Sequence, residues 1–437
     1  MTTISVIGCG YLGAVHAAAM ASLGHEVIGV DLDQRRIDML SASKAPFFEP
    51  GLEDLLHDAQ ALGSLKFSTD LSEISAASVH FLCVGTPQRK GELGADMTFV
   101  DAAFSSVLQH ATAGDLIVGK STVPVGTASR LAELAGSADG VLVAWNPEFL
   151  REGHAVEDTL SPDRLVYGVP DGAAGEQATT RLDEVYADIL RRDTTRLVTD
   201  YATAELVKTA ANSFLATKIS FINAMAELCE ASGADVTQLA DAIGMDDRIG
   251  RKFLNAGLGF GGGCLPKDIR AFMARAGELG ADQAVAFLRE IDAINMRRRI
   301  RMVDLVREVC GGSLIGKRVT VLGAAFKPNS DDVRDSPALS VAAQLSLQGA
   351  DVVVTDPEAI DNARSRFPEL NYVADTIDAL RGADAVLLAT EWTEYRELSP
   401  DQLKSVVGVP AILDGRNVLD PGLWRAAGWT YRALGRR

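Results

Sequence analysis

The sequence predicts an α/β protein with two Rossmann-like, doubly wound parallel-sheet domains joined by a long central helix. Three observations support this prediction. Short apolar strands alternate with helical patterns over the first 200 residues, a long Ala-rich segment without Pro follows, and the strand–turn pattern returns near residue 316. A chain of 437 residues leaves room for two or three domains. The expected domains are a first Rossmann-like domain at 1–200, a central helical domain at 201–312 and a second Rossmann-like domain at 313–437.

The first domain opens with a short apolar strand at Ile4–Gly8. A glycine turn and an Ala-rich helix through Ser22 follow, and the next strand, Val27–Val30, ends at Asp31. Because strands keep alternating with helical patterns, a parallel sheet is expected that ends near Thr199. Its further strands are predicted at Val79–Val84, Leu116–Gly119 and Val141–Ala144.

The middle of the chain reads as one long helix from Ala202 to about Gly233. This stretch has no Pro, and its apolar residues recur at helical spacing. Further helices are expected to about Glu308. A long helix between two α/β domains could serve as a connector and as a dimer surface.

The segment from Gly316 onward resembles a second, degenerate copy of the first domain. KRVTVLGAAF repeats the strand and turn, and DVVVTDP repeats the strand that ends in an acid. DAVLLAT and AILDG supply further strands. Since the copy lacks the second and third glycines of the first turn, we expect it to bind a different ligand.

The composition excludes several functions. The formal net charge of −17 argues against a nucleic-acid or anionic-membrane partner, because both require a basic face. No apolar run approaches the length of a membrane span, and the N-terminus has no signal-peptide features, so a cytoplasmic location is expected. The five cysteines are scattered and none form CxxC, which predicts neither a disulfide framework nor a metal site.

A glycine motif, Gly8-x-Gly10-x-x-Gly13, follows the first strand and opens a helix. The first glycine permits a tight turn, the second lets the backbone approach a pyrophosphate, and the third lets helix and strand pack closely. The helix N-terminus then offers free N–H groups to phosphate. Asp31 can accept both ribose hydroxyls and would repel a 2′-phosphate, which favours NAD over NADP, although the nearby Arg36 can weaken this rule. The alternative is a glycine turn that serves packing alone.

Cys264 lies in the segment GFGGGCLPKD. Pro266 is a natural first-turn residue, so Cys264 is expected just before a helix N-terminus and beside Lys267, and both features favour the thiolate. The preceding glycines are expected to let the backbone approach a ligand. A thiolate near a nicotinamide suggests covalent catalysis on an aldehyde. All six histidines lie at or before His154, which weakens a Cys–His hydrolase interpretation. The alternative is a cysteine buried as a small apolar side chain.

Several long segments resemble the UDP-glucose/GDP-mannose dehydrogenase family, and the resemblance covers essentially the whole chain. The segments are GCGYLG at 8–13, FFEPGLEDLL at 47–56, VGTP at 84–87, KSTVPVGT at 120–127, NPEFLREG at 146–153, ELVKTAANSFLATKISFIN at 205–223, GMDDRIGRKFLNAGLGFGGGCLPKD at 244–268 and GAAFKPNSDDVRDSP at 323–337. The resemblance implies an NAD-dependent, four-electron oxidation of a nucleotide sugar to a carboxylate. UDP-glucose is the expected substrate and UDP-glucuronate the product. GDP-mannose and UDP-N-acetylmannosamine remain alternatives, and a non-catalytic nucleotide-sugar-binding protein is an alternative of another class.

The resemblance also implies roles for single residues. Cys264 matches the catalytic thiol, Asp268 and Lys208 match acid/base groups, and Glu148 and Thr122 match residues that activate and hold the hydrolytic water. Asn212 lies one helical turn after Lys208, a spacing that suits joint stabilisation of an oxyanion. The implied NAD contacts are Gly8, Gly10, Tyr11, Leu12, Gly13, Asp31, Arg36, Thr86, Thr122, Glu152, Lys267 and Arg334. The implied substrate contacts are Glu148, Phe149, Leu150, Lys208, Asn212, Arg248, Asn255, Phe260, Gly261 and Lys327, with Arg248 reaching the neighbouring subunit of a homodimer.

Some of these residues also have a purely structural interpretation. Lys208 could be a solvated helical charge, and Glu148 after Asn-Pro could be a turn residue. Departures from the family pattern are small and fall at Gly263, Ser330 and Asn255, of which Asn255 bears on the sugar nucleotide accepted. The basic run Arg297, Arg298, Arg299 and Arg301 is predicted to be a solvated helical face.

Overall fold

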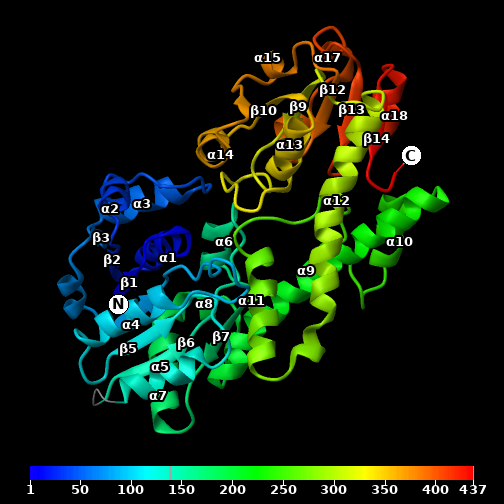
Figure 1. Cartoon of the computed structure of the whole chain (residues 1–437). Coiled ribbons are helices and arrows are strands. Elements are labelled where there is room, and N and C mark those ends of the chain that lie inside the picture. Colours follow the sequence, from blue (N-terminus) through cyan, green and yellow to red (C-terminus); the bar gives the residue numbers. More distant parts are fainter. Residues whose placement is uncertain (137–139, 437) are drawn as a thin grey trace. The chain divides into compact units, whose positions relative to one another are not determined.

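The computed structural model describes residues 1–136 and 140–436 (Figure 1). The chain divides into two compact units. The first unit comprises residues 1–211 with 270–282, and the second comprises residues 212–269 with 283–437. The expected division into domains 1–200, 201–312 and 313–437 stays a prediction.

The first unit contains an eight-stranded sheet with the order β3-β2-β1-β4-β5-β6-β7-β8. Its first six strands have the 3-2-1-4-5-6 order of the dinucleotide-binding fold. The predicted strands therefore form, with ends shifted by one or two residues. The strands are β1 (Thr3–Ile7), β2 (Glu26–Val30), β3 (Leu65–Ser68), β4 (Val79–Leu82), β5 (Leu116–Gly119), β6 (Leu142–Trp145), β7 (Arg164–Gly168) and β8 (Thr195–Thr199).

Helices cover both faces of this sheet. Because side chains alternate along a strand, Phe81 of β4 packs in a core with α1 and α7, whereas Leu82 packs in a second core with α4 and α5. The helices of the unit are α1 (Tyr11–Ser22), α2 (Gln34–Ser41), α3 (Leu52–Ala61), η1 (Leu71–Ala76), α4 (Thr98–Leu108), α5 (Thr127–Ala135), α6 (Ala155–Leu160), α7 (Ala173–Val185) and α8 (Ala187–Leu190).

The end of the sheet differs from the predicted all-parallel arrangement. β7 pairs antiparallel with β6 through Trp145 and Gly168, and β7 and β8 are parallel to each other. The connection from β6 to β7 contains only the six-residue helix α6, which is shorter than an ordinary crossover helix. The chain therefore turns back on itself after β6.

The predicted long helix is present as α9 (Tyr201–Ser232), which has 32 residues and crosses the boundary between the two units. Phe214, Phe221 and Leu228 are exposed on it at seven-residue spacing, so they share one face. The further helices are α10 (Val236–Gly244), α11 (Leu265–Glu278), η2 (Asp282–Val285) and α12 (Phe287–Val309). In the described part of the chain, no helix is both long and apolar enough to span a membrane.

The second unit contains a six-stranded parallel sheet with the order β11-β10-β9-β12-β13-β14, which repeats the 3-2-1-4-5-6 order of the first. The predicted second copy is therefore confirmed. Its strands are β9 (Arg318–Leu322), β10 (Asp351–Thr355), β11 (Asn371–Tyr372), β12 (Ala385–Leu388), β13 (Ala411–Asp414) and β14 (Thr430–Ala433). Its helices are α13 (Pro337–Leu347), α14 (Ile360–Arg366), α15 (Thr376–Leu380), α16 (Thr393–Arg396), α17 (Pro400–Leu403) and α18 (Pro421–Ala426).

The acid after the second strand is used differently in this copy. Asp356, after β10, is buried and accepts the N–H groups of Ala324 and Ala325 and the indole N–H of Trp392. A 14-residue loop, 323–336, separates β9 from α13, whereas α1 starts four residues after β1. The second copy therefore lacks the short turn that brings a helix N-terminus to a pyrophosphate.

Candidate active site

The glycine turn has the geometry that each glycine was expected to provide. Gly8 has φ +88°, a left-handed conformation that favours glycine. A Cβ on Gly13 would lie 1.8 Å from the Gly8 carbonyl oxygen, so helix and turn can pack only without a side chain there. A Cβ on Gly10 would meet nothing within 4 Å, and no side chain caps α1 at this residue. The N-terminus of α1 is therefore open to an anion, which fits the pyrophosphate of NAD.

Asp31 is held in place at the end of β2. Its Oδ2 accepts the Cys9 N–H at 2.7 Å and the Arg36 guanidinium at 2.8 Å, and its Oδ1 accepts the Asp33 N–H at 2.9 Å. Arg36 also lies 3.7 Å from the Asp33 carboxylate. Because two acids already match its charge, Arg36 gives little support to a 2′-phosphate, and the preference for NAD stands.

Glu49 is a structural residue that sequence reasoning missed. It is buried, accepts the Tyr11 hydroxyl, and accepts the N–H groups of Gly153 and Ala155 at 2.7 Å each. These hydrogen bonds connect the start of α1 to the segment that contains Glu152. The signal that could have identified it is its position in FFEPGLEDLL, one of the segments that resemble the family.

Lys208 and Glu148 form an ion pair in the first unit. The Lys208 Nζ lies 3.0 Å from Glu148 Oε1, and the two side chains are 6% and 14% exposed. Glu148 Oε2 accepts the Leu150 N–H at 2.5 Å, which shapes the turn after β6. The Phe149 ring contacts the Arg164 guanidinium at 3.9 Å and lies 5.6 Å from Lys208 Nζ. The solvated interpretation of Lys208 is therefore wrong.

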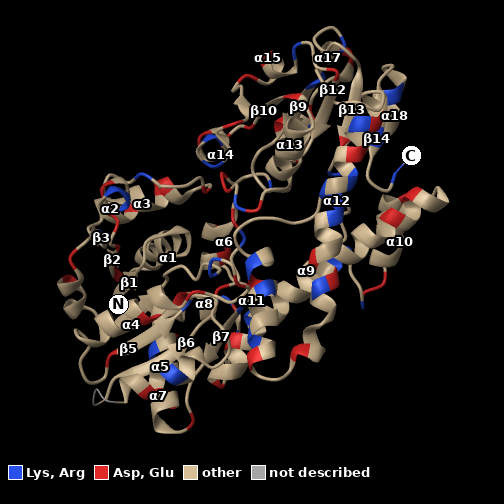
Figure 2. Ribbon diagram, in the orientation of Figure 1, with Lys and Arg blue, Asp and Glu red and all other residues tan. Residues whose placement is uncertain are grey.

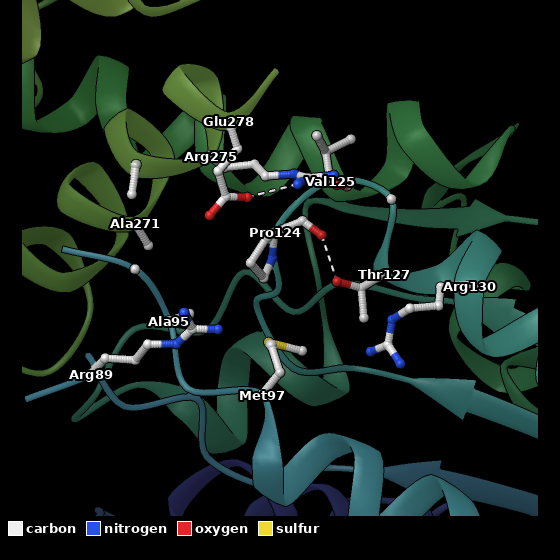
Figure 3. A pocket seen from close by; sticks show the side chains of 13 residues that line it. Arg89, Ala95, Met97, Pro124, Val125, Thr127, Arg130, Ala271, Arg275 and Glu278 are labelled. Atoms are coloured by element: carbon white, nitrogen blue, oxygen red, sulfur yellow. Dashed lines mark hydrogen bonds and ion pairs between the residues drawn. The ribbon is translucent and has the colours of Figure 1, made fainter. Parts of the chain in front are cut away.

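Thr122 lies in the loop between β5 and α5. The Thr86 hydroxyl donates to the Thr122 carbonyl oxygen at 2.8 Å, which joins two predicted cofactor residues. Further along the loop, Arg275 of α11 donates to the Val125 carbonyl oxygen at 2.9 Å, and Figure 3 shows its guanidinium reaching this loop beside Glu278. A shallow pocket of about 220 Å³ opens here, lined by Val125, Gly126, Thr127, Arg89, Arg130 and Arg275 among others.

Glu205, near the start of α9, caps α5. Its carboxylate accepts the N–H groups of Gly126 and Ala128 at 2.7 Å each, although the side chain is buried. Burial raises the pKa of Glu205 to about 7, against the opposing effect of the two backbone N–H donors and Arg275. The folded state therefore holds this proton more tightly than the unfolded chain, and stability should fall as pH rises from about 4.5 through about 7.

Replacing Glu205 with Gln should remove this pH dependence. Between pH 5 and pH 7.5, the wild type should lose on the order of 2–3 kcal/mol of unfolding free energy relative to Glu205→Gln, on top of a constant offset for the altered hydrogen bonds. Urea unfolding at both pH values measures this difference. Glu133→Gln, on an exposed position of α5, is the matched control. Parallel pH profiles for the wild type and Glu205→Gln would contradict a raised pKa.

The second unit brings Asn212, Asp268 and Cys264 into one local arrangement. Asp268 is 2% exposed, and its carboxylate accepts the Asn212 amide at 2.7 Å and the Lys267 ammonium at 2.6 Å. Its backbone N–H donates to the Cys264 carbonyl oxygen at 2.9 Å, which is the first turn of α11. Cys264 is exposed and directly precedes this helix, as predicted, although the helix begins at Leu265 rather than Pro266.

The glycines before Cys264 lie close against other parts of the second unit. A Cβ on Gly259 would lie 2.1 Å from Asn295 Oδ1, one on Gly261 would lie 2.3 Å from the Asp335 carbonyl oxygen, and one on Gly263 would lie 2.2 Å from Arg334 Cζ. These glycines accommodate the protein's own atoms. The expectation that they also let the backbone approach a ligand stays a prediction.

The basic run on α12 is the predicted solvated face only in part, because Arg297 is exposed and Arg301 half-buried whereas the two arginines between them are buried. Arg298 and Arg299 are 1% and 2% exposed, and Figure 2 shows acidic residues interspersed with the basic ones along this helix. Arg298 pairs with Glu230 at 2.6 Å, and Arg299 pairs with Asp335 at 2.8 Å and donates to the Phe260 carbonyl oxygen at 3.1 Å. Arg301 pairs with Glu230, and Arg297 with Glu290. Half-buried acids and a backbone carbonyl group, which a local sequence pattern does not reveal, hold the two middle arginines.

The loop that carries Phe260 is therefore anchored by α12. Asn295 accepts the Phe260 N–H at 2.8 Å and donates to its carbonyl oxygen at 3.0 Å. Arg416, after β13, donates to the Gly259 carbonyl oxygen at 2.9 Å. Neither Asn295 nor Arg416 was singled out from the sequence, because both act through tertiary contacts with a loop far away in the chain.

Other predicted ligand residues lie at exposed or half-buried positions. Arg248 is 89% exposed and pairs with Asp246, and Arg334 pairs with Asp332 at 2.8 Å. Lys327 lies 5.4 Å from the Phe326 ring. Asn255 accepts the Arg251 guanidinium at 2.8 Å and lines a cavity of about 280 Å³ beyond the carboxyl ends of β12 and β13. Arg251, Arg396, Arg416 and Glu391 also line this cavity. Within the described residues, no cluster of His, Cys, Asp and Glu could hold a metal ion.

Comparisons with known proteins agree with this geometry. Three models of the UDP-glucose/GDP-mannose dehydrogenase family match consecutive segments: the NAD binding domain at residues 2–190, the central domain at 202–297 and the UDP binding domain at 320–421. The UDP-glucose 6-dehydrogenase of Rhizobium meliloti is 42% identical, over 99% of both chains. The UDP-glucose 6-dehydrogenase TuaD of Bacillus subtilis is 39% identical, over 100% of this chain and 94% of that protein.

A solved structure of a UDP-glucose dehydrogenase from Pyrobaculum islandicum is also similar, with a TM-score of 0.90 and 38% identity over 100% of this chain and 98% of that one. The family models, the full-length relatives and the two repeated sheets lead to the same assignment. The chain belongs to the UDP-glucose/GDP-mannose dehydrogenase family.

Proposed function

We propose that this chain oxidises the C6 hydroxyl of UDP-glucose to a carboxylate, with two NAD per sugar. The observation that carries the proposal is Cys264, which is exposed at the start of α11, one turn from the buried Asp268–Asn212 pair. A nucleophile at a helix N-terminus, with an acid and an amide beside it, suits covalent catalysis on an aldehyde. A non-catalytic binding protein would not require this combination.

The first oxidation removes the hydroxyl proton and a hydride from C6. Asp268 is the proposed acceptor of the proton, directly or through a water, and the Lys208 ammonium stabilises the developing alkoxide. NAD, when bound to the glycine turn and Asp31, supplies the electron acceptor in each of the two oxidation steps. Asn212 donates to the same oxygen through its amide group.

The second oxidation starts with the addition of Cys264 to the aldehyde. The C–S bond forms as the aldehyde oxygen becomes an alkoxide, and loss of the second hydride leaves a thioester. Water then attacks this thioester, assisted by Glu148 and by the Thr122 hydroxyl. The C–S bond breaks, the thiolate leaves, and UDP-glucuronate is released.

The sugar nucleotide is proposed to bind mainly to the second unit. Its cavity of about 280 Å³ carries three arginines and Asn255, which suit a diphosphate and a polar sugar or base. Phe260, Gly261 and Lys327 are proposed to complete the contacts, and Glu148, Phe149 and Leu150 to contact the sugar. GDP-mannose and UDP-N-acetylmannosamine remain the alternative substrates, since Asn255 falls at a position that bears on this choice.

The cofactor contacts carried over from the family are part of the same proposal, including Tyr11, Leu12, Thr86, Glu152, Lys267 and Arg334. A homodimer is also proposed, because Phe214, Phe221 and Leu228 leave an apolar stripe exposed on α9. Arg248, which is exposed beside Asp246, is proposed to reach the neighbouring subunit's substrate. A cytoplasmic location is the accompanying expectation.

NADH formation at 340 nm tests the proposal, with UDP-glucose, GDP-mannose and UDP-N-acetylmannosamine each present in limiting amount. About two NADH per UDP-glucose are expected for the four-electron reaction. Activity with another sugar alone would change the substrate and keep the mechanism. One NADH per sugar would mean that the reaction stops at the aldehyde, and no NADH with any of them would favour the binding protein.

A further inference from the structure

Lys120 is a buried cation that the proposed mechanism does not use. It follows β5 directly, and it is 7% exposed. Its Nζ donates to Asn146 Oδ1 at 2.9 Å and to the Tyr186 hydroxyl at 3.3 Å, and lies 5.8 Å from the rings of Phe81 and Tyr186. Both hydrogen-bond partners are neutral, and Lys120 takes part in no ion pair within residues 1–136 and 140–436.

Such a site is costly for the folded state. Burying an ammonium without a counter-charge is unfavourable, and an apolar side chain of similar length would avoid the desolvation cost. The burial lowers the pKa of Lys120 to about 8. A residue that reduces stability in this way often serves function instead.

The position of Lys120 relates it to two predicted catalytic residues. Thr122 follows Lys120 by two residues, and Glu148 follows Asn146 by two residues. β5 and β6 are neighbouring parallel strands, and the Asn146 N–H donates to the Gly119 carbonyl oxygen at 2.8 Å. The Lys120–Asn146 bond therefore joins the carboxyl ends of the two strands at the points where the Thr122 and Glu148 loops begin.

Asn146 is fixed on every side. Its Oδ1 also accepts the Tyr186 hydroxyl at 2.7 Å, and its Nδ2 donates to the Val166 carbonyl oxygen at 2.9 Å. The side chain is 1% exposed, so the amide has little freedom to find other partners. Loss of the Lys120 donor would remove both charge-assisted bonds of this network, the one to Asn146 and the one to Tyr186.

The ionisable groups that face Lys120 come from several elements. Burial lowers the pKa of Lys120 most, Cys83 after β4 and Glu148 after β6 act to raise it, and Lys208 of α9 acts to lower it. Burial and, next in size, the charge of Lys120 lower the pKa of His16 of α1. The Glu148 carboxylate therefore interacts with two cations, with Lys208 in an ion pair at 3.0 Å and with Lys120 through electrostatics alone.

We propose that Lys120 is a positioning residue for thioester hydrolysis: through Asn146 it fixes the turn that presents Glu148 relative to the Thr122 loop. This inference rests on the proposed function. Both hydride transfers precede the hydrolysis, so they do not need this arrangement to the same degree. In the hydrolytic step, water adds to the thioester carbon, the C–S bond breaks, and the proton of the water passes to Glu148 while the Cys264 thiolate leaves.

The test is Lys120→Met, with Tyr186→Phe as the matched control, because the latter removes the other donor to the same Asn146 oxygen without changing charge. Lys120→Met is expected to have an equal or higher melting temperature and a steady-state rate at least about tenfold lower. Rapid mixing with NAD and UDP-glucose should give a burst of about two NADH per active site, and intact-mass analysis should find the acyl adduct on Cys264. Tyr186→Phe should keep its rate within about threefold.

Three results would overturn the inference. They are an unchanged steady-state rate, a fall in rate without a burst or an adduct, and a lowered melting temperature with every step slowed equally, which would indicate a structural role. The wild type in the same assay separates this failure from a failure of the proposed function. If the wild type forms no NADH, the proposed function is wrong, whereas an active wild type with an unaffected Lys120→Met refutes the inference alone.

Discussion

Replacing Cys264 with Ala is expected to lower kcat by at least about 10³-fold while changing the Kd of UDP-glucose by less than about threefold. Cys264 is exposed, and its side chain supports no core, so its removal should not disturb folding. The loss arises because the aldehyde then has no nucleophile with which to form the thioester. Steady-state NADH formation measures kcat, and calorimetric titration of UDP-glucose measures binding.

Two further variants sharpen this result. Cys264→Ser should accumulate an ester that hydrolyses slowly, which intact-mass analysis can detect. Cys310→Ala, at the C-terminus of α12, removes another thiol and should leave turnover within about twofold. Full turnover by Cys264→Ala would eliminate the covalent step and leave a direct oxidation of the hydrated aldehyde.

Sequence reasoning was most successful where function depends on local backbone geometry. The glycine turn is an example, since Gly8, Gly10 and Gly13 are separated by at most five residues and each has the environment expected for it. The position of Cys264 before a helix is another, because Pro266 marks a helix start through its own covalent geometry. Both signals are contained in a short window of sequence.

Sequence reasoning failed where a charge is matched by a distant residue. Arg298 and Glu230 are separated by 68 positions, and Arg299 and Asp335 by 36, so the basic run looked like a solvated face. Lys208 looked like a surface charge for the same reason, since its partner Glu148 belongs to a loop 60 residues earlier. A periodic pattern records which residues share a helix face, and it contains no information on which acids lie opposite.

The two copies of the fold show how one sequence feature can acquire two uses. In both, the acid after the second strand accepts the N–H that follows the first glycine, Cys9 for Asp31 and Ala324 for Asp356. Asp356 is additionally enclosed by a second backbone N–H and by Trp392, and is 3% exposed. Asp356 is therefore enclosed by the protein, whereas Asp31 also accepts protein donors but is only half-buried and lies beside the uncapped N-terminus of α1. This difference explains why the first copy suits a dinucleotide and the second requires another mode of binding.

Replacing Lys208 with Met is expected to reduce kcat by about 10²- to 10⁴-fold, the second large effect. Lys208 is 6% exposed at its side chain and lies 3.0 Å from Glu148, so the substitution removes a cation that the alkoxide needs and also leaves a nearly buried carboxylate without its partner. The melting temperature should fall as a consequence. The Kd of NAD should stay within about threefold, because the proposed NAD site is carried by the glycine turn and Asp31, and Asp31 is held by Cys9, Asp33 and Arg36.

The double variant Lys208→Met with Glu148→Gln separates the two contributions. Glu148→Gln removes the unpaired charge, so the double variant should recover most of the thermal stability lost by Lys208→Met but none of its activity. Restored activity would mean that Lys208 serves only to neutralise Glu148, and the oxyanion role would have to be assigned to Asn212 alone. Because Glu148 also assists thioester hydrolysis, the deciding measurement is the NADH formed in the first turnover, before hydrolysis. Recovered stability without this first-turnover NADH would identify Lys208 as the group that stabilises the alkoxide.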